Sequence, residues 1–428
     1  MKITQDEEKL EKVLEKFYNR YNKYNTKVLQ TLGNVIKQFD GLTVTQAHQL
    51  AQELKLGMDV YDLQKELSKI SGKSIQDVNE LLDKVAKENV EFSEVYYKAK
   101  NKEYVKYEDN EPLQNLVESI KKQTDSTFVN LAKSNSTGFV LKDEQGNKTF
   151  KSIPEVYNNL IDEAVYNVET GVQDYQSAMR NTIRGLADSG VKIHEEKLGY
   201  SSGYNRRIDS SVRQDVLTGI RQVNLGIQEE IGKEIGADGV EISAHSPCAE
   251  DHLDIQGRQY TLKEYEKLNN NLMRPIGYYN CHHFAFQIVL GVSEPSYTKK
   301  QLTRLKKEST ENVSYKGKTY TKYEATQVQR NFESAIRVQK DRQITARASG
   351  NNEEVLLAQQ KISQLTTEYN NFSKTVGLDT YKNRLSVTGY RRVAKSQLTW
   401  YNVIECLYTL TTKTHYLRVV YWWYIWER

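Results

Sequence analysis

The chain has 428 residues, enough for two or three domains with a buried core. Sixty Lys and Arg residues nearly balance 56 Asp and Glu, so the net charge of +4 does not indicate a nucleic-acid-binding protein. Three cysteines, no signal-peptide pattern and no apolar run of membrane-spanning length predict a cytoplasmic, reduced protein.

Residues 1–130 are predicted to form a helical N-terminal region. From residue 9 to 39, apolar side chains recur at steps of three and four, the spacing that lines one face of a helix. Asp40-Gly41 ends this helix, and Thr43 or Thr45 can cap the next one. Helical patterning continues through Leu81, Leu82, Val85 and Phe92. We interpret the region as a scaffold that packs on itself or on a partner.

Residues 131–300 have the pattern of a central α+β domain. A short hairpin is predicted where 138–141 and 149–150 flank a Gln-Gly-Asn turn. A helix follows from about Ile153, and another ends at Gly190. The longest helix follows residue 207, with Asp209 or Ser210 as its cap. "VEISAH" (240–245) then predicts a strand that ends at His245.

Residues 301–390 are predicted to form a hairpin of long helices. Two helical segments are separated by "SGNN" (349–352), and their polar faces carry both signs of charge, which is typical of a solvated face or a partner surface. The fold class expected for the whole chain is therefore α+β, predominantly helical.

Residues 391–428 form an aromatic tail of different composition, predicted to lie outside the fold. All four tryptophans occur here, three of them in "YLRVVYWWYIWER". The tail has three interpretations: an interfacial anchor, a strand that joins a partner's sheet, or an accidental C-terminus such as a shifted reading frame. The abrupt change of composition favours the third.

Most of the histidines and two of the three cysteines fall within "SAHSPCAEDHLDIQG" and "GYYNCHHFAF". A zinc site needs four nitrogen or sulfur ligands, and the candidates are Cys248, His252, Cys281 and His283. However, the short Cys-x2–4-Cys knuckle of structural zinc sites is absent. The neighbouring His282 points to the opposite face of a strand from His283, so only one of the two can serve.

The same residues allow three further interpretations. A His-Asn-His type nuclease would use Asn280 and His283 with Asp251 and His252, but no consistent spacing of base and metal ligands emerges. A Cys–His nucleophile pair requires a proximity that sequence does not show. The favoured interpretation is a buried polar network that fixes the fold without catalysis and binds no metal. Its predicted members are His245, Asp251, His252, Gln256, Gly257, Asn280, Cys281 and His283.

Several motifs in order carry a family resemblance. They are "TGFV", "LADSG", "RRIDSSVRQDVLTGIRQ", "DGVEISAHSPCAEDHLDIQG", "RPIGYYNCHHF" and "GVSEPSYT". Together they resemble the minor capsid protein 2 family of tailed bacteriophages, related to Mu F-type head-morphogenesis proteins, over about residues 130 to 390. The family's "SAH", "DH…QG" and "NCRH" match Ser243 to His245, then Asp251, His252, Gln256 and Gly257, and finally Asn280, Cys281 and His283. His282 stands where the family commonly has arginine, and Cys248 falls in a variable stretch.

The resemblance implies a non-enzymatic structural protein of the virion, present in few copies. Its expected partners are the portal and other head proteins, together with packaged DNA, within a larger assembly and without a membrane. It would act in head assembly and in DNA packaging or delivery, and would reside in the host cytoplasm during assembly. The alternative function is a metal-dependent, nuclease-like hydrolase carried in the head. A toxin-like effector is a third possibility, but no extra domain after residue 300 indicates one.

Overall fold

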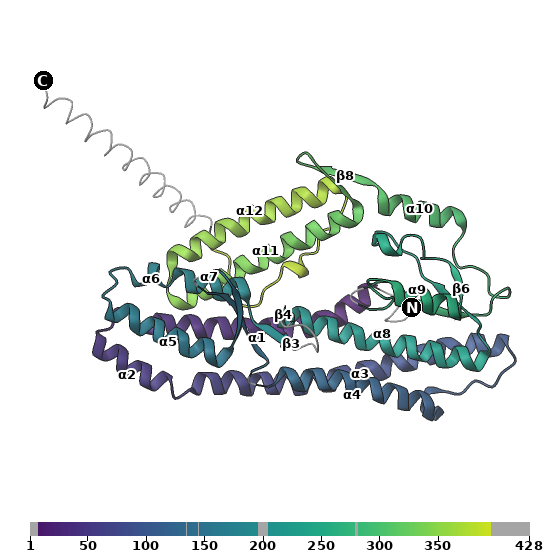
Figure 1. The fold of residues 1–428 in the computed structure, drawn as a ribbon, viewed down its shortest axis with the longest axis horizontal. Helices are drawn as coiled ribbons and strands as arrows, with labels where there is room; N and C mark the ends of the chain where they lie inside the picture. The colour runs from purple at the N-terminus through teal and green to yellow at the C-terminus, as the bar shows by residue number, and fades with distance from the viewer. Residues whose placement is uncertain (1–6, 134, 144, 196–203, 279–280, 395–428) are drawn as a thin grey trace, which may run out of the picture.

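The computed structural model describes residues 7–394, apart from 134, 144, 196–203 and 279–280. The molecule is elongated, with a layer of long helices along its length and a pair of helices stacked obliquely over one side of that layer (Figure 1). A small sheet with its own helices lies at one end. The predominantly helical α+β fold expected from the sequence is confirmed.

The N-terminal region forms four helices, as the apolar periodicity predicts. They are α1 (Glu7–Gln38), α2 (Val44–Leu54), α3 (Met58–Ala99) and α4 (Glu111–Leu131). In α1 the predicted apolar stripe is buried, with Val13 half-buried. Thr43 caps α2 through a capping box: Thr43 Oγ1 accepts the Gln46 backbone N–H, and Gln46 Oε1 accepts the Thr43 backbone N–H.

The central region begins with a four-stranded antiparallel sheet in the order β2-β1-β3-β4. Its strands are β1 (Thr137–Lys142), β2 (Lys148–Ser152), β3 (Lys192–Glu195) and β4 (Tyr204–Arg207). The helices of this part are α5 (Ile153–Glu169), α6 (Tyr175–Ala178), α7 (Arg180–Ser189) and α8 (Ile208–Ile235). The predicted hairpin is therefore confirmed, and Gly190 ends α7.

A second, three-stranded sheet follows α8. Its strands β5 (Gly239–Ile242), β6 (Gln259–Thr261) and β7 (Ala285–Ile288) pair in the antiparallel order β6-β5-β7. The short 3-10 turn η2 (Glu250–His252) and helix α9 (Leu262–Asn271) lie between the strands in sequence. The predicted strand 240–245 stops at Ile242, so His245 lies three residues beyond it.

The predicted helical hairpin consists of α11 (Lys322–Ser349) and α12 (Asn352–Val376). Two elements precede it that the periodicity did not indicate: α10 (Lys299–Thr310) and the hairpin of β8 (Asn312–Tyr315) with β9 (Lys318–Thr321). Two further 3-10 turns are η1 (Tyr107–Asp109) and η3 (Asn383–Leu385). Nearly all of the aromatic tail, from residue 395 on, lies outside the described residues.

One large buried cluster crosses the predicted domain boundaries. It joins side chains from α1, α3, α4, α5, α7 and α8 to Ala346 of α11, Val355 of α12 and Val393. Two smaller clusters lie under the three-stranded sheet and between α11, α12 and the β8–β9 hairpin. The boundaries at 130, 300 and 390 stay predictions, and packing is continuous across them.

The predicted cap of α8 is wrong. Arg207 occupies the cap position without a side-chain cap bond, and Asp209 lies inside the first turn, fully buried. Asp209 turns into the core because Arg207 and Asn22 both bind its carboxylate, at 3.3 Å each. Arg207 also binds Asp341 of α11 at 2.7 Å, so a buried ion network joins α8 to the helical hairpin.

A second ionic cluster fastens α3 to α1 around Asp77, whose side chain is only 5% exposed. Burial opposes ionisation of Asp77, but hydrogen bonds from Arg20, Lys16 and Lys73 outweigh burial and lower its pKa to about 2. The stabilisation is therefore complete above the unfolded pKa of about 3.9 and is lost as pH falls toward the folded pKa.

We expect Asp77→Asn to lower the free energy of unfolding at neutral pH and to flatten its decline between about pH 4 and pH 2. Urea titrations across this pH range check the expectation, with Asp62→Asn on the exposed face of α3 as control. An equal decline of the free energy of unfolding at low pH in Asp77→Asn and in the wild type would contradict the expectation.

Candidate functional site

The candidate site lies beside the three-stranded sheet, where the chain leaves β5 and returns into β7. The segment after β5 is held by the Gly257 N–H, which donates to the Ile242 carbonyl at 2.7 Å. Gly257 has φ of +68°, and a Cβ there would lie 2.2 Å from Leu302 Cδ2 of α10. The positive φ favours glycine, and the Leu302 side chain would have to move to admit a Cβ, so α10 packs closely against this turn.

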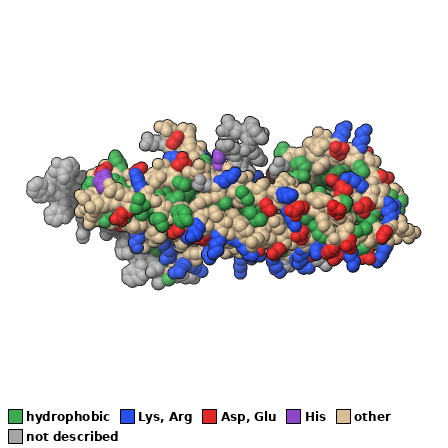
Figure 2. Space-filling model, turned by 90° about the horizontal axis from the view of Figure 1, so that it is seen from below, with side chains coloured by type: hydrophobic (Ala, Val, Ile, Leu, Met, Phe, Trp, Pro, Cys, Tyr) green, Lys and Arg blue, Asp and Glu red, His purple; other side chains and the backbone are tan. Residues whose placement is uncertain are grey.

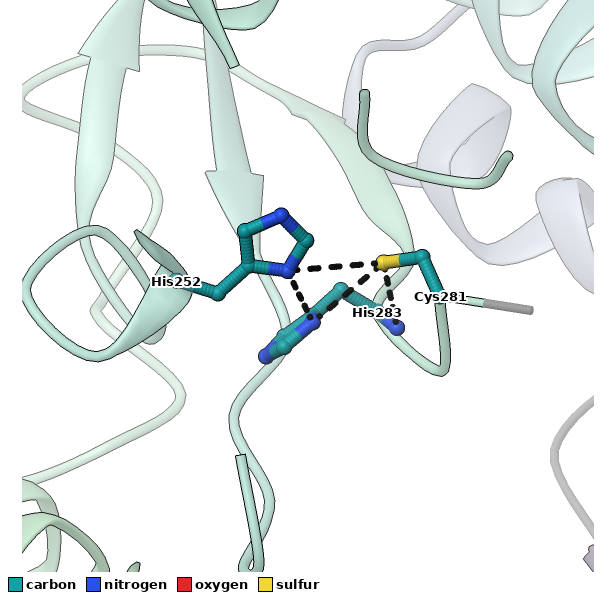
Figure 3. Close-up of side chains that lie close together, drawn as sticks. All are labelled: His252, Cys281 and His283. Carbon is teal, nitrogen blue, oxygen red and sulfur yellow. Dashed lines mark hydrogen bonds between the residues drawn. The ribbon is translucent and has the colours of Figure 1, made fainter. Parts of the chain in front are cut away.

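Three buried side chains converge in this space (Figure 3). His252 comes from η2, while Cys281 and His283 come from the loop before β7. The two Nδ1 atoms of His252 and His283 are 3.3 Å apart. Cys281 Sγ lies 3.7 Å from His252 Nδ1 and 3.4 Å from His283 Nδ1. One potential ligand atom from each residue therefore faces the same point.

The outer nitrogens of both rings are held by carbonyl oxygens. His252 Nε2 lies 2.8 Å from the Arg274 backbone carbonyl, so this nitrogen carries the hydrogen and donates. His283 Nε2 lies 3.0 Å from Gln256 Oε1, which also accepts the His245 backbone N–H at 3.0 Å. Because that N–H needs an oxygen, the amide orientation is fixed, and His283 Nε2 must donate. When both rings are neutral, each thus presents a lone pair at Nδ1.

The two buried cysteines have different electrostatic surroundings. Burial alone would raise the pKa of Cys281, but a hydrogen bond from His252 Nδ1 when that ring is protonated, together with the backbone N–H groups of Gly277 and His283, outweighs burial and lowers it. Burial disfavours the His252 cation, but the same pairing with Cys281 outweighs burial and raises the pKa of His252. Burial raises the pKa of Cys248 to about 12. Burial also lowers the pKa of His283 far below its usual value, which keeps that ring neutral. Cys281 is therefore the thiol that ionises more readily.

The other predicted site residues lie around this trio. The His245 ring packs on His283 with 4.2 Å between ring centroids. Cys248 Sγ is 3.7 Å from His283 Nε2, on the far side of the ring from the convergent atoms, and donates to the Ala249 carbonyl at 3.3 Å. Asp251 binds Arg274 at 2.8 Å. Asn280 lies outside the described residues.

Arg274 connects the site to the rest of the molecule more extensively than its sequence position indicates. Its backbone carbonyl orients His252, and its guanidinium binds both Asp251 and the Tyr323 hydroxyl of α11, the latter at 2.7 Å. "RPIGYYN" marks a loop in the sequence. No residue pattern in the sequence indicates that a backbone carbonyl orients a histidine ring.

Comparison with known families supplies the decisive observation. The family model described as phage minor capsid protein 2 matches residues 6–374. The chain belongs to the phage minor capsid protein 2 family. A search of curated proteins and a search of solved structures each found no match.

Membership of the phage minor capsid protein 2 family confirms the resemblance and extends it. The motifs cover only about residues 130 to 390, whereas the family match begins at residue 6 and therefore includes α1 to α4. The four-helix N-terminal region thus lies within the family match. The match ends at residue 374, before the aromatic tail. As a member of this family, the chain is a structural protein of the phage head.

No helix within the described part of the chain is long and apolar enough to cross a membrane.

Proposed function

We propose that this minor capsid protein associates with the portal and other head proteins during assembly in the host cytoplasm, and that it acts in packaging or delivery of DNA. Family membership is the observation that carries this proposal. The elongated helical architecture supports it, because helices such as α3, with 42 residues, present long surfaces to partners. In this role the protein has no turnover.

The charge distribution of the helical layer suits protein partners. Helix α3 carries six lysines and nine acidic residues. Figure 2 shows both signs of charge interspersed over the face that α3 and α4 occupy in the view from below. A surface of mixed charge provides complementary pairs for a protein, whereas a DNA-binding groove concentrates positive charge.

Helix α10 is the part of the chain that we assign to DNA contact. It carries five basic residues and one acidic residue, and most of its side chains are exposed. Lys306 pairs with Asp254 at 2.6 Å on the surface beside the three-stranded sheet. A basic exposed helix attracts phosphate groups without reading sequence, as packaging of a whole genome requires.

The test separates head assembly from DNA contact. Co-expression with the portal protein of the same phage is expected to yield a complex that co-elutes in size-exclusion chromatography, and purified heads should contain the chain. Failure to co-elute and absence from heads would overturn the portal assignment.

We expect the triple variant Lys299→Glu, Lys300→Glu and Lys307→Glu in α10 to enter heads normally but to bind DNA with an affinity reduced more than tenfold. The log–log slope of its salt dependence should decrease by about 0.9 for each DNA phosphate that the variant no longer neutralises. The matched control reverses three exposed lysines of α3, namely Lys65, Lys69 and Lys84. An equal reduction of DNA affinity in both triple variants would contradict a DNA contact at α10.

The rival function, a metal-dependent hydrolase, has less support from the geometry. His252 and His283 are each 2% exposed and Cys281 is 8% exposed, so a polymeric substrate has no direct access to them. A cavity of about 700 Å³ lies elsewhere, lined by side chains of β1, β2, α5 and α7. Nuclease assays of the pure chain with Mg²⁺, Mn²⁺ and Zn²⁺ discriminate the functions: cleavage abolished by His252→Ala would favour the hydrolase.

A further inference from the structure

We propose that His252, Cys281 and His283 together bind one zinc ion, which holds the loop before β7 against η2. The ion is structural, and the site differs from the four-ligand candidate set of the sequence because Cys248 is not a ligand; water would fill the fourth position. The favoured interpretation of the sequence has no metal. The inference concerns how the protein is held together and does not depend on which partners the chain meets in the head.

The three distances fit a tetrahedral ion. Zinc binds nitrogen at about 2.0–2.1 Å and sulfur at about 2.3 Å, so tetrahedral angles place two nitrogens about 3.3 Å apart and nitrogen and sulfur about 3.6 Å apart. The observed separations are 3.3 Å between the nitrogens, and 3.4 and 3.7 Å between sulfur and each nitrogen. Three corners of a zinc tetrahedron are therefore already formed.

The site has fewer hydrogens than acceptor atoms, which a cation would correct. Because the outer nitrogens donate to Arg274 O and to Gln256 Oε1, neither Nδ1 atom carries a hydrogen when its ring is neutral. The one remaining hydrogen, on Cys281 Sγ or shared with His252 Nδ1, cannot satisfy both nitrogens and the sulfur. A zinc ion satisfies all three atoms and displaces that hydrogen, so one proton is released and the sulfur binds as thiolate.

The surroundings have the form of a second coordination shell. Histidine ligands of metals typically donate their other ring N–H to a carbonyl or carboxylate, which fixes the ring orientation. Both His252 and His283 do so here. The backbone N–H of His283 also points at Cys281 Sγ, at 3.4 Å, a contact that favours the thiolate.

Cys248 provides an internal contrast. It lies near His283 Nε2, the nitrogen that faces away from the convergent atoms, and its thiol hydrogen is directed to the Ala249 carbonyl. A zinc ion bound to His283 Nδ1 lies on the other side of the ring, so Cys248 Sγ cannot bind the same ion. Of the two buried thiols near His283, Cys281 is therefore assigned as a ligand and Cys248 is not.

A structural ion would add a constraint to a small apolar cluster. Its buried residues under the three-stranded sheet are Val240, Ile242, Ile276, Cys281 and Ala285, with Leu225, Ile255, Tyr260, Tyr265, Leu268 and Leu272 partly buried against them. An ion bound by His252 and by the loop of Cys281 and His283 would link two segments about thirty residues apart in sequence.

The experiment uses the full chain without a histidine tag, with Cys406→Ser as background because Cys406 is the remaining thiol in the sequence. We expect about one zinc per chain by elemental analysis. After replacement by Co²⁺, absorption should show tetrahedral d–d bands and a thiolate-to-cobalt charge-transfer band. Cys281→Ser should abolish the charge-transfer band and reduce metal affinity at least tenfold. Cys248→Ser should keep the charge-transfer band and the metal affinity of the background protein.

Chelation of the wild type keeps the test valid if Cys281→Ser does not fold. Removal of the ion should lower the melting temperature, and Zn²⁺ but not Mg²⁺ should restore it, because Mg²⁺ prefers oxygen ligands. Absence of stoichiometric metal together with no cobalt spectrum would overturn the proposal. Equal loss of metal by Cys248→Ser and Cys281→Ser would overturn the three-ligand assignment.

Discussion

Replacing Arg207 by methionine is expected to lower the free energy of unfolding by about 3–5 kcal/mol, because it leaves two buried carboxylates without their cation. Asp209 and Asp341 are fully buried, and Arg207 bridges them. Burial disfavours its charge, but the two carboxylates outweigh burial and raise the pKa of Arg207. Burial raises the pKa of Asp341, whereas Arg207 outweighs burial at Asp209 and holds that pKa well below its usual range.

The matched control is Arg342→Met. Arg342 makes a two-pronged pair with Asp188, at 2.6 Å for both contacts, and likewise joins α11 to the central region. Because Asp188 is 45% exposed, this pair should contribute less than about 1 kcal/mol. Urea unfolding of both variants measures the difference. Equal destabilisation would show that the Arg207 network is no more important to stability than a surface pair.

The second large effect is expected at Gly33, where α1 crosses α11. A Cβ at this position would lie 2.6 Å from Ala348 Cβ and 2.8 Å from the Thr345 carbonyl oxygen. Neither atom belongs to a flexible side chain, so the two helices must separate. We expect Gly33→Ala to destabilise the protein by about 2 kcal/mol, even though alanine is the better helix former.

Gly72, which also lies in a long helix (α3), is expected to show a stability change of opposite sign. It lies on an exposed part of the helix, and nothing is within 4 Å of a Cβ built there. Gly72→Ala should therefore stabilise the protein by about 0.5–1 kcal/mol through helix propensity alone. Thermal and urea unfolding of the two variants should show changes of opposite sign. A stabilising effect of Gly33→Ala would contradict the close crossing of α1 and α11.

Local patterns predicted the helices and turns that depend on nearby residues. The stripe of α1, the Thr43 cap, the Gly190 stop and the hairpin of β1 and β2 all follow from spacing and turn chemistry within a few residues. The prediction was wrong at Asp209, which has a good capping residue type at a suitable position. Its carboxylate turns inward because Arg207 and Asn22 bind it, and Arg207 is itself held by Asp341 of α11. Asn22 and Asp341 come from distant segments.

At the candidate site, sequence supplied the residue types, and the structure supplied their directions. Cys248 and Cys281 are the same residue type, and each has two histidines within four residues in the sequence. Which ring nitrogen each thiol faces depends on how η2 and the loop before β7 meet at the sheet. The hydrogen positions depend on the Arg274 carbonyl and the Gln256 amide, and a backbone carbonyl leaves no signature in a sequence.

By itself the sequence determined the helical character, the family to which the chain belongs and the concentration of ligand-type residues between 245 and 283. Those properties reside in periodicity and in ordered motifs, which are one-dimensional. Only the tertiary structure decided that α11 packs on α1 through Gly33, that Asp209 is part of a buried ion network, and that three ligand atoms of the predicted set converge while that of Cys248 does not. Each of these depends on the relative placement of segments tens to hundreds of residues apart, which local spacing does not encode.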